Sequence, residues 1–154
     1  MKVLIADEDA AVRESLSVVL KGAGYETVLA GNGQEAVNLF DPEKIDFLLL
    51  DLSLPIRDGW ETFEKITRMA PELPIIIITS KVDQYNTALA AGVGALMEKP
   101  LDVMELLQTI EVMLAEPKEV RLRRLCGYSH NARFIPAVFR SGFSRYPGNI
   151  EPRA

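Results

Sequence analysis

Short apolar runs alternate with helix-like segments along most of the chain, and this alternation limits the fold more than any other feature. Two of the runs, Asp46–Leu50 and Ile75–Thr79, are apolar at nearly every position. Such strands are buried on both faces, and they need helices on both sides of their sheet. Parallel sheets have this arrangement, because each crossover lays a helix on a face. The pattern therefore predicts an α/β protein.

The same pattern repeats five times. The expected strands are Lys2–Ala6, Tyr25–Ala30, Asp46–Leu50, Ile75–Thr79 and Ala95–Glu98, each followed by residues at helical spacing. Right-handed crossovers leave few topologies for such a chain. We predict a three-layer, doubly wound (βα)5 fold of the flavodoxin-like type. Its five-stranded parallel sheet should have the order 2-1-3-4-5, with a crevice beyond the carboxyl ends of strands 1 and 3.

Polar side chains follow four of the predicted strands at their carboxyl ends. Asp7 and Glu8 come after the first strand, and Asp51 ends the third. Thr79 ends the fourth strand, and Lys99 follows the fifth. Because carboxyl ends of parallel strands meet at one edge of a sheet, these groups should gather at the predicted crevice.

Three carboxylates at short range repel one another unless a cation lies among them. Oxygen ligands with room for water favour Mg²⁺, with Mn²⁺ as the substitute. A divalent ion together with Lys99 would neutralise a phosphoryl group, to which Thr79 would donate a hydrogen bond. Asp51, at the mouth of the central strand, is the best-placed nucleophile, and a carboxylate can form an acyl phosphate.

Four motifs then point to a family. They are Asp7-Glu8, the run Asp51–Pro55 with Asp58-Gly59, the strand Ile75–Thr79, and Lys99-Pro100. In this order and spacing, residues 1–116 resemble the receiver domain of two-component response regulators. The resemblance implies that Asp51 accepts a phosphoryl group from a sensor histidine kinase or a phosphotransfer protein.

The resemblance also implies a set of residue roles. Asp7, Glu8, Asp51 and the backbone carbonyl of Ser53 would hold Mg²⁺. Thr79 and Lys99 would bind the phosphoryl group, and the Lys99–Pro100 peptide bond would be cis. A downstream protein partner would bind the face formed by helix 4, strand 5 and helix 5, and a homodimer through this face is a further expectation.

Three positions bear on how closely the chain follows the family pattern. Leu96 stands in strand 5 where the family usually has an aromatic residue that turns with Thr79. Signalling would then use backbone shifts alone, or Tyr85 would take part. Ser53 and Lys81 occupy the positions that tune hydrolysis of the acyl phosphate in this family. Neither is a carboxylate or an amide that could position a water, so we predict a long-lived phosphoryl group with slow autodephosphorylation.

Several of these residues also have plainer interpretations. Asp9 is expected to cap a helix rather than bind metal, and Asp58-Gly59 fits turn and cap chemistry. Cys126 is expected to be a packed or idle thiol. His130 has no neighbour at metal-ligand spacing, and we assign it no role.

Three other functions compete with the receiver interpretation. Asp7, Thr79 and Lys99 also resemble motifs of haloacid-dehalogenase-like phosphatases, with Asp7 as the nucleophile, although the further acidic pair of that family is missing. A flavin or nucleotide module would need Ser, Thr and Gly after strand 1, where three acids stand instead. The third alternative is a receiver-like interaction module that is never phosphorylated.

Charge is distributed unevenly along the chain. Residues 1–116 hold 9 Lys and Arg against 20 Asp and Glu, whereas residues 117–154 hold 8 against 2. We predict a receiver domain over 1–116 and a basic extension over 117–154 that is too short to bury a core of its own. A short helix should include Val120, Leu122 and Leu125. Arginines interleaved with aromatics indicate nucleic acid as a minor hypothesis. Disorder, packing on the acidic body or on a second copy, and absence of function are the alternatives.

The chain has no apolar run of the roughly 20 residues that a membrane helix needs. Its beginning, Met1–Ala6, is too short for a secretory signal. The single Cys126 excludes an internal disulfide and agrees with a reducing compartment. We therefore expect a cytoplasmic protein without membrane contact.

Overall fold

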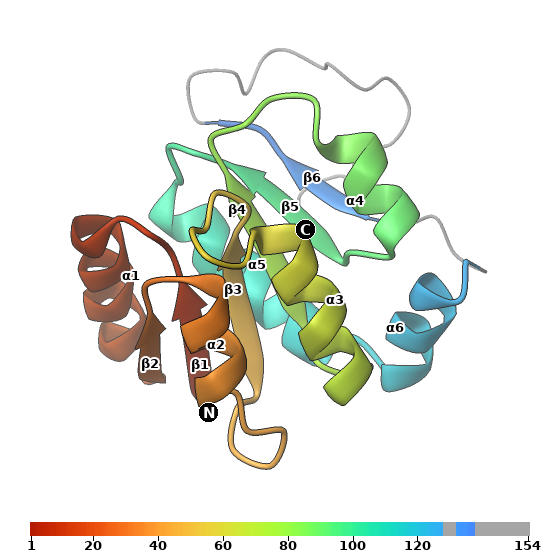
Figure 1. The fold of residues 1–154 in the computed structure, drawn as a ribbon, viewed down its shortest axis with the longest axis horizontal. Coiled ribbons are helices and arrows are strands. Elements are labelled where there is room, and N and C mark those ends of the chain that lie inside the picture. Colours follow the sequence, from red (N-terminus) through yellow and green to blue (C-terminus); the bar gives the residue numbers. More distant parts are fainter. Residues whose placement is uncertain (128–131, 138–154) are drawn as a thin grey trace. The chain divides into compact units, whose positions relative to one another are not determined.

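The computed structural model describes residues 1–127 and 132–137. Strands and helices alternate along the chain (Figure 1), in the order β1 (Lys2–Ala6), α1 (Ala10–Gly22), β2 (Glu26–Ala30), α2 (Gly33–Leu39), β3 (Phe47–Asp51), α3 (Gly59–Met69), β4 (Ile75–Thr79), α4 (Tyr85–Ala91), β5 (Ala95–Glu98), α5 (Val103–Ala115), α6 (Lys118–Leu125) and β6 (Arg133–Ile135). The chain divides into two compact units, Met1–Ile75 and Ile76–Ala154, called here the first half and the second half.

The strand order is β2-β1-β3-β4-β5-β6. The predicted flavodoxin-like α/β fold is therefore confirmed, as is the predicted order of the first five strands. The structure adds a sixth strand, β6, which the sequence analysis did not predict. This strand comes from the C-terminal extension and pairs in parallel with β5.

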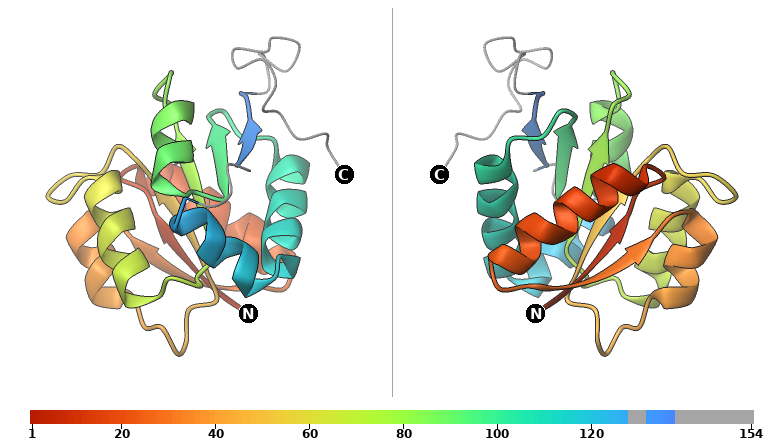
Figure 2. Two further views of the ribbon diagram at one scale, coloured as in Figure 1. Left: turned by 90° about the vertical axis from the view of Figure 1, so that its right-hand side faces the viewer. Right: turned by 90° about the vertical axis from the view of Figure 1, so that its left-hand side faces the viewer.

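In the first half, β1 is the middle strand, with β2 and β3 paired to it in parallel. All five residues of β3 are buried, as expected for a strand covered on both faces. Figure 2 shows α1 on one face of these strands and α2 and α3 on the other. The apolar core of this half thus surrounds the strands that lead to Asp7 and Asp51.

Each helix of the first half begins with a side-chain cap. Asp9 accepts hydrogen bonds from the backbone at the start of α1, as predicted. Asn32 caps α2, and Asp58 caps α3 by accepting from the amide of Glu61. These side chains satisfy amides that would otherwise lack partners at a helix start.

Two glycines allow close backbone contacts in the first half. A Cβ on Gly59 would lie 2.3 Å from Cα of Leu52, and a Cβ on Gly33 would lie 1.9 Å from the carbonyl oxygen of Arg57. Both distances are far below van der Waals contact. The loop after β3 therefore packs against the starts of α2 and α3 with no room for a side chain.

In the second half, β5 is the middle strand between β4 and β6. Figure 2 shows α4 and α5 on opposite faces of these strands. Asp102 caps α5 by accepting from the amide of Glu105. By contrast, the residue before α4 is Gln84, whose side chain makes no capping hydrogen bond. A seven-residue helix without a cap is only weakly held by its own sequence.

The predicted short helix in the extension is present as α6, and it packs into the second half. Arg124 is only 5% exposed and forms two hydrogen bonds to the carboxylate of Glu116, at 3.0 and 2.5 Å. Arg121 is also buried and donates to the carbonyl of Met113. Gly92, with φ of 80°, lets α6 approach, since a Cβ there would lie 2.9 Å from the Arg124 carbonyl oxygen.

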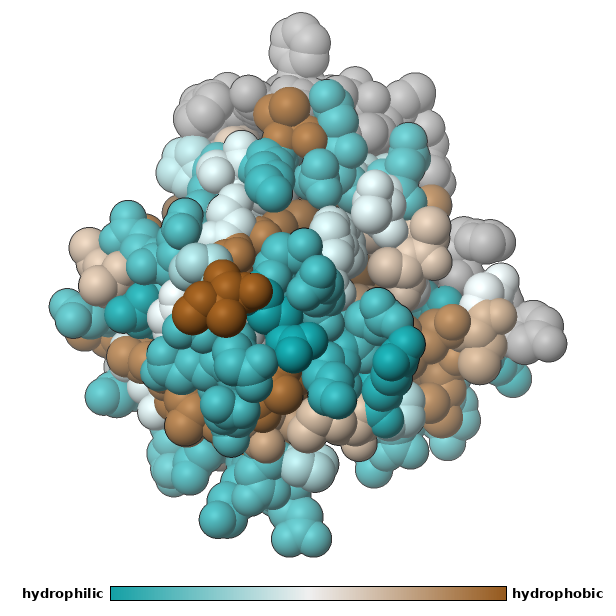
Figure 3. All heavy atoms as spheres, viewed as in Figure 1, coloured by the Kyte–Doolittle hydropathy of each residue, from teal (hydrophilic) through white to brown (hydrophobic). Residues whose placement is uncertain are grey.

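Polar residues cover most of the face seen in Figure 3, and apolar residues appear there in small separate groups. None of the helices in the described part of the chain is both long and apolar enough to cross a membrane.

Candidate functional site

Two buried carboxylates lie side by side in the first half. Ala6 of β1 is paired with Leu50 of β3, so Asp7 and Asp51 each come one residue beyond this pair. Asp7 is fully buried and Asp51 is 3% exposed. The strand pairing therefore brings these two predicted site residues together at the carboxyl edge of β1 and β3.

Local hydrogen bonds fix the two carboxylates. Oδ1 of Asp7 accepts from the amide of Asp9 at 2.9 Å, and Oδ1 of Asp51 accepts from the amide of Ser53 at 3.0 Å. Arg13 of α1 donates to the carbonyl of Asp7 at 2.7 Å and thereby anchors the loop after β1. Carboxylate oxygens such as these are the ligands that hard divalent cations prefer.

The third predicted acid lies differently. Glu8 is exposed, whereas Asp7 and Asp51 are buried. Among residues 1–127 and 132–137, no three His, Cys, Asp or Glu side chains form a group that could hold a metal ion. The side-chain ligands that the first half does bring together are thus the pair Asp7 and Asp51, with Ser53 next to them.

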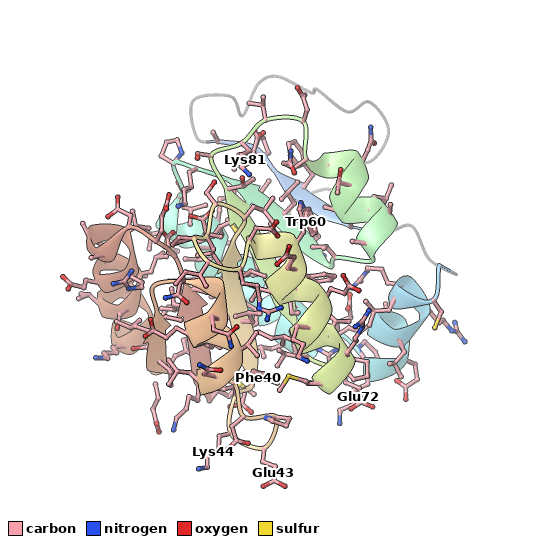
Figure 4. The ribbon with its side chains drawn as sticks, in the orientation of Figure 1. Phe40, Glu43, Lys44, Trp60, Glu72 and Lys81 are labelled. Carbon is pink, nitrogen blue, oxygen red and sulfur yellow. The ribbon has the colours of Figure 1, made fainter. Side chains whose placement is uncertain are left out.

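The loop before β3, at the opposite end of that strand from Asp51, carries exposed charged residues. Glu43 and Lys44 lie in the loop before β3, far along the strand from Asp51 (Figure 4). Lys44 forms an exposed ion pair with Asp41, three residues before it, and such pairs contribute little. The buried carboxylates belong to the carboxyl edge, as the sequence predicted.

Thr79 and Lys99 come together in the second half. Thr79 at the end of β4 is paired with Glu98 at the end of β5, and the amide of Lys99 donates to the Thr79 carbonyl at 2.8 Å. Thr79 is fully buried, while Lys99 is partly exposed. The Lys99–Pro100 peptide bond is cis.

The Thr79 hydroxyl is tied to the loop that leads to α4. Its Oγ1 accepts a hydrogen bond from the amide of Lys81 at 2.9 Å. Figure 4 shows Lys81 in that loop, beyond the end of β4. Leu96, in the middle of β5, is 1% exposed, and Tyr85 at the start of α4 is equally buried.

Residues 3–111 match the family described as the response regulator receiver domain. The chain belongs to this receiver family. Receiver domains are phosphoacceptors rather than classical enzymes, and they interact with histidine kinases or phosphotransfer proteins.

Individual relatives agree with this membership. The chain is 34% identical over 120 residues to "Response regulator MprA" of Mycobacterium avium, an alignment that covers 77% of this chain and 53% of the relative. The receiver chain thus spans about half the length of such curated relatives.

Solved receiver structures are also similar. A CheY-like receiver domain protein from Methanospirillum hungatei has a TM-score of 0.71 at 31% identity, covering 77% of this chain and 95% of that one. The response regulator TrrA from Thermotoga maritima, solved in complex with Mg²⁺-BeF, has a TM-score of 0.67 at 25% identity, covering 73% and 97%.

Sequence reasoning missed two features of this receiver domain. Arg13 gave no signal, because its donation to the Asp7 carbonyl depends on how α1 packs. The ring of Tyr85 packs edge-to-face against Phe134 of β6, at 5.5 Å between centroids. Nearly fifty residues separate these two aromatics, so only the pairing of β6 with β5 makes them neighbours.

Proposed function

We propose that this protein is a phosphoacceptor response regulator of a two-component phosphorelay, and that Asp51 receives the phosphoryl group. The observation that carries the proposal is the placement of Asp51 beside Asp7, both buried at the carboxyl edge of paired strands. A carboxylate oxygen of Asp51 would attack phosphorus, and the bond from phosphorus to the donor's leaving group would break. The products are an acyl phosphate and the released leaving group.

The chemistry of the donor set fits Mg²⁺. Asp7 and Asp51 are the side-chain ligands that we propose, with the Ser53 carbonyl and the exposed Glu8 as further oxygen donors, and Mn²⁺ as a substitute. A bound ion supplies charge neutralisation for the incoming phosphoryl group. Support comes from the TrrA relative, which was solved with Mg²⁺-BeF. The chain itself contributes the fixed positions of the two aspartates, through the amides of Asp9 and Ser53.

We assign Thr79 and Lys99 to the phosphoryl oxygens. The Lys99 ammonium would neutralise charge, and the Thr79 hydroxyl would donate a hydrogen bond. The hydrogen bond from the Lys99 amide to the Thr79 carbonyl holds the two residues together and supports a joint role. Pro100, Asp58 and Gly59 are proposed to shape the loops around these groups.

The phosphoryl group is proposed to persist, because Ser53 and Lys81 offer no carboxylate or amide to position an attacking water. Slow autodephosphorylation is the expected result, and the half-life of the acyl phosphate measures it. A substitution Lys81→Asn or Ser53→Asn should shorten that half-life. Hydrolysis of the acyl phosphate as fast as in chemotaxis regulators would contradict this part of the proposal.

The proposed partners are a sensor histidine kinase and a downstream protein that binds α4, β5 and α5, in a cytoplasmic setting. Any homodimer through this face would have to include β6, which pairs with β5. We propose a receiver over 1–116 and an extension over 117–154 without an independent fold.

Nucleic-acid binding by the extension has less support than the sequence indicated. Arg121 and Arg124 are buried and bonded to Met113 and Glu116, so they are not available to phosphates. Arg140, Tyr146 and the other arginines and aromatics after residue 137 lie outside the described residues, as does His130.

Mass spectrometry after treatment with acetyl phosphate tests the main proposal. Wild type with Mg²⁺ should gain one phosphoryl group, located on Asp51 by fragmentation, and chelation should abolish the gain. Asp51→Asn should gain none. Asp46→Asn is the matched control, since Asp46 is exposed and lies before β3, at the opposite end of that strand from Asp51. A phosphoryl group found on Asp7 instead would favour the phosphatase alternative, and no gain in any condition would favour an unphosphorylated module.

A further inference from the structure

The short strand β6 is held on the second half by a ring contact as well as by backbone pairing. Phe134, in the middle of β6, is 4% exposed, and its ring packs edge-to-face on Tyr85 of α4 at an interplanar angle of 77°. Tyr85 is 1% exposed. At the edge of the strand, the amide of Arg133 donates to the carbonyl of Gly94 at 2.9 Å. Ala132 and Ala137, on either side of β6, are buried too.

The strand register connects this ring to Thr79. Phe134 is paired with Leu96 on β5, and Leu96 is paired with Ile77 on β4. Because side chains alternate along a strand, Ile77 and Thr79 point to the same face of the sheet. Phe134 meets Tyr85 of α4, and the register places Phe134 and Thr79 on the same face of the sheet.

The loop between β4 and α4 also connects Thr79 to Tyr85, over a shorter distance along the chain. Tyr85 is the first residue of α4, and the loop that precedes it begins at Thr79. The amide of Lys81 in that loop donates to the Thr79 hydroxyl, and Gln84 provides no cap to fix the start of the helix. Tyr85 therefore links the loop after Thr79 to Phe134.

We propose that the segment Ala132–Ala137 reports the phosphorylation state of the protein, because Phe134 holds it on β5 through the ring of Tyr85, which moves with Thr79. The inference rests on the proposed phosphorylation of Asp51. It assigns a regulatory role to the C-terminal extension and makes Phe134 a positioning residue.

The physical step is a competition for the Thr79 hydroxyl. Rotating Oγ1 toward a phosphoryl oxygen carries away the acceptor that the Lys81 amide uses. The loop must then follow or lose that hydrogen bond, and the uncapped start of α4 offers little resistance. Tyr85 shifts with the loop, and an edge-to-face ring pair is sensitive to such displacement. Phosphorylation therefore loosens β6.

Hydrogen exchange of the full chain, measured by mass spectrometry on peptides that cover 132–137, is the direct test. With acetyl phosphate and Mg²⁺, exchange in this segment should become about tenfold faster, and tenfold corresponds to about 1.4 kcal/mol. The amide of Arg133 is the most informative single site, since its hydrogen bond to Gly94 is lost when β6 leaves.

Two variants test the ring contact. Phe134→Ala should give fast exchange in 132–137 with or without the phosphodonor, while uptake of the phosphoryl group stays at the wild-type level. Ile135→Ala is the matched control, because Ile135 neighbours Phe134 but points to the other face and is only partly buried. This control should keep a response to the phosphodonor.

A third variant makes the coupling testable without phosphorylation. Thr79→Val keeps nearly the same volume but removes the acceptor of the Lys81 amide, and exchange in 132–137 should rise several-fold, about threefold to tenfold for one hydrogen bond. Unchanged exchange in Thr79→Val would overturn the coupling even if Asp51 never takes up a phosphoryl group.

The remaining outcomes separate the two proposals. A missing mass increase counts against the proposed function alone. A wild-type chain that gains the phosphoryl group but shows unchanged exchange in 132–137 overturns the reporting role of β6. A Phe134→Ala chain that still responds as wild type does would show that the ring contact is not the link.

Discussion

The two halves of the molecule build similar parallel strands but hold their helices in different ways. In the first half, Asp9, Asn32 and Asp58 each cap a helix, and glycine contacts close the loop after β3. In the second half, α4 starts without a cap, and parts of the extension pack around it instead. The half that carries Asp51, the proposed phosphoacceptor, is fixed by local contacts, whereas the other half depends on contacts distant in sequence.

This difference suits a signalling protein. An acceptor site needs side chains in fixed positions, because phosphoryl transfer relies on placement and electrostatics. A responding region needs an element with little local stability, so that a small change can move it. The four predictions below test this contrast, beginning with the largest expected effect.

The extension should be essential for the stability of the second half. Arg124→Ala leaves the partly buried carboxylate of Glu116 without its partner, and we expect a loss of about 3–5 kcal/mol in the free energy of unfolding by urea. Arg123→Ala is the matched control on the exposed side of α6 and should change it by less than about 0.5 kcal/mol. Equal effects of the two variants would contradict the contrast between the halves, because the buried contact of α6 would then contribute nothing to the stability of the second half.

The first half should not tolerate a side chain at Gly59, where the start of α3 contacts the loop after β3. Gly59→Ala places a Cβ 2.3 Å from the Leu52 backbone, and we expect a loss of about 3 kcal/mol in urea unfolding. Gly22→Ala should instead stabilise by roughly 0.5–1 kcal/mol, because Gly22 ends α1 with nothing within 4 Å of its added Cβ. A tolerated Gly59→Ala would mean that the loop after β3 is not rigid.

Removal of the side chain of the residue before a helix should lower the free energy of unfolding by a smaller amount, and it should do so more in the first half than in the second. Asp58→Ala removes the acceptor for the Glu61 amide and should cost about 1 kcal/mol. Gln84→Ala, at the equivalent position of α4, should cost less than about 0.5 kcal/mol because no cap is lost. Thermal or urea unfolding measures both. A larger cost at Gln84 would contradict the weak start that we assign to α4.

Relief of backbone strain should give the smallest difference in the free energy of unfolding between variants of the two halves. Ile56 has φ of 69°, a left-handed conformation that is costly for a β-branched residue, and it is 82% exposed. Ile56→Asn should stabilise by roughly 0.5–1 kcal/mol. Asp83 in the second half has φ of 60° but already tolerates it, so Asp83→Asn should have almost no effect. Destabilisation by Ile56→Asn would show that the exposed isoleucine makes contacts of its own.

The sequence predicted the parts of this molecule that follow from local rules. Short apolar runs such as Asp46–Leu50 indicate strands buried on both faces, and the crossover rule then limits their order. The caps Asp9 and Asp58 were predictable because their hydrogen bonds reach only two or three residues ahead. The pairing of Ala6 with Leu50 places Asp7 beside Asp51, so this part of the candidate site also followed from strand order.

The extension shows where such reasoning stops. Arg133–Ile135 is a three-residue strand that shows no alternation long enough to recognise. Buried Arg124 looked like a solvent-exposed charge in a basic segment, because its partner Glu116 is assigned to it only by the packing of α6 on α5. Asp7 is buried and Glu8 is exposed because of the path of the chain between β1 and α1, and the sequence pattern does not reveal that path.

The position of β6 has a consequence for the behaviour of the protein at high concentration. An uncovered outer strand presents a row of backbone donors and acceptors that can recruit strands from other molecules. Arg133–Ile135 occupies that row along β5 and becomes the edge strand itself, with only three residues. So short an edge strand offers few backbone groups to another molecule, and a shortened chain lacking β6 should lose solubility through edge-to-edge pairing at β5.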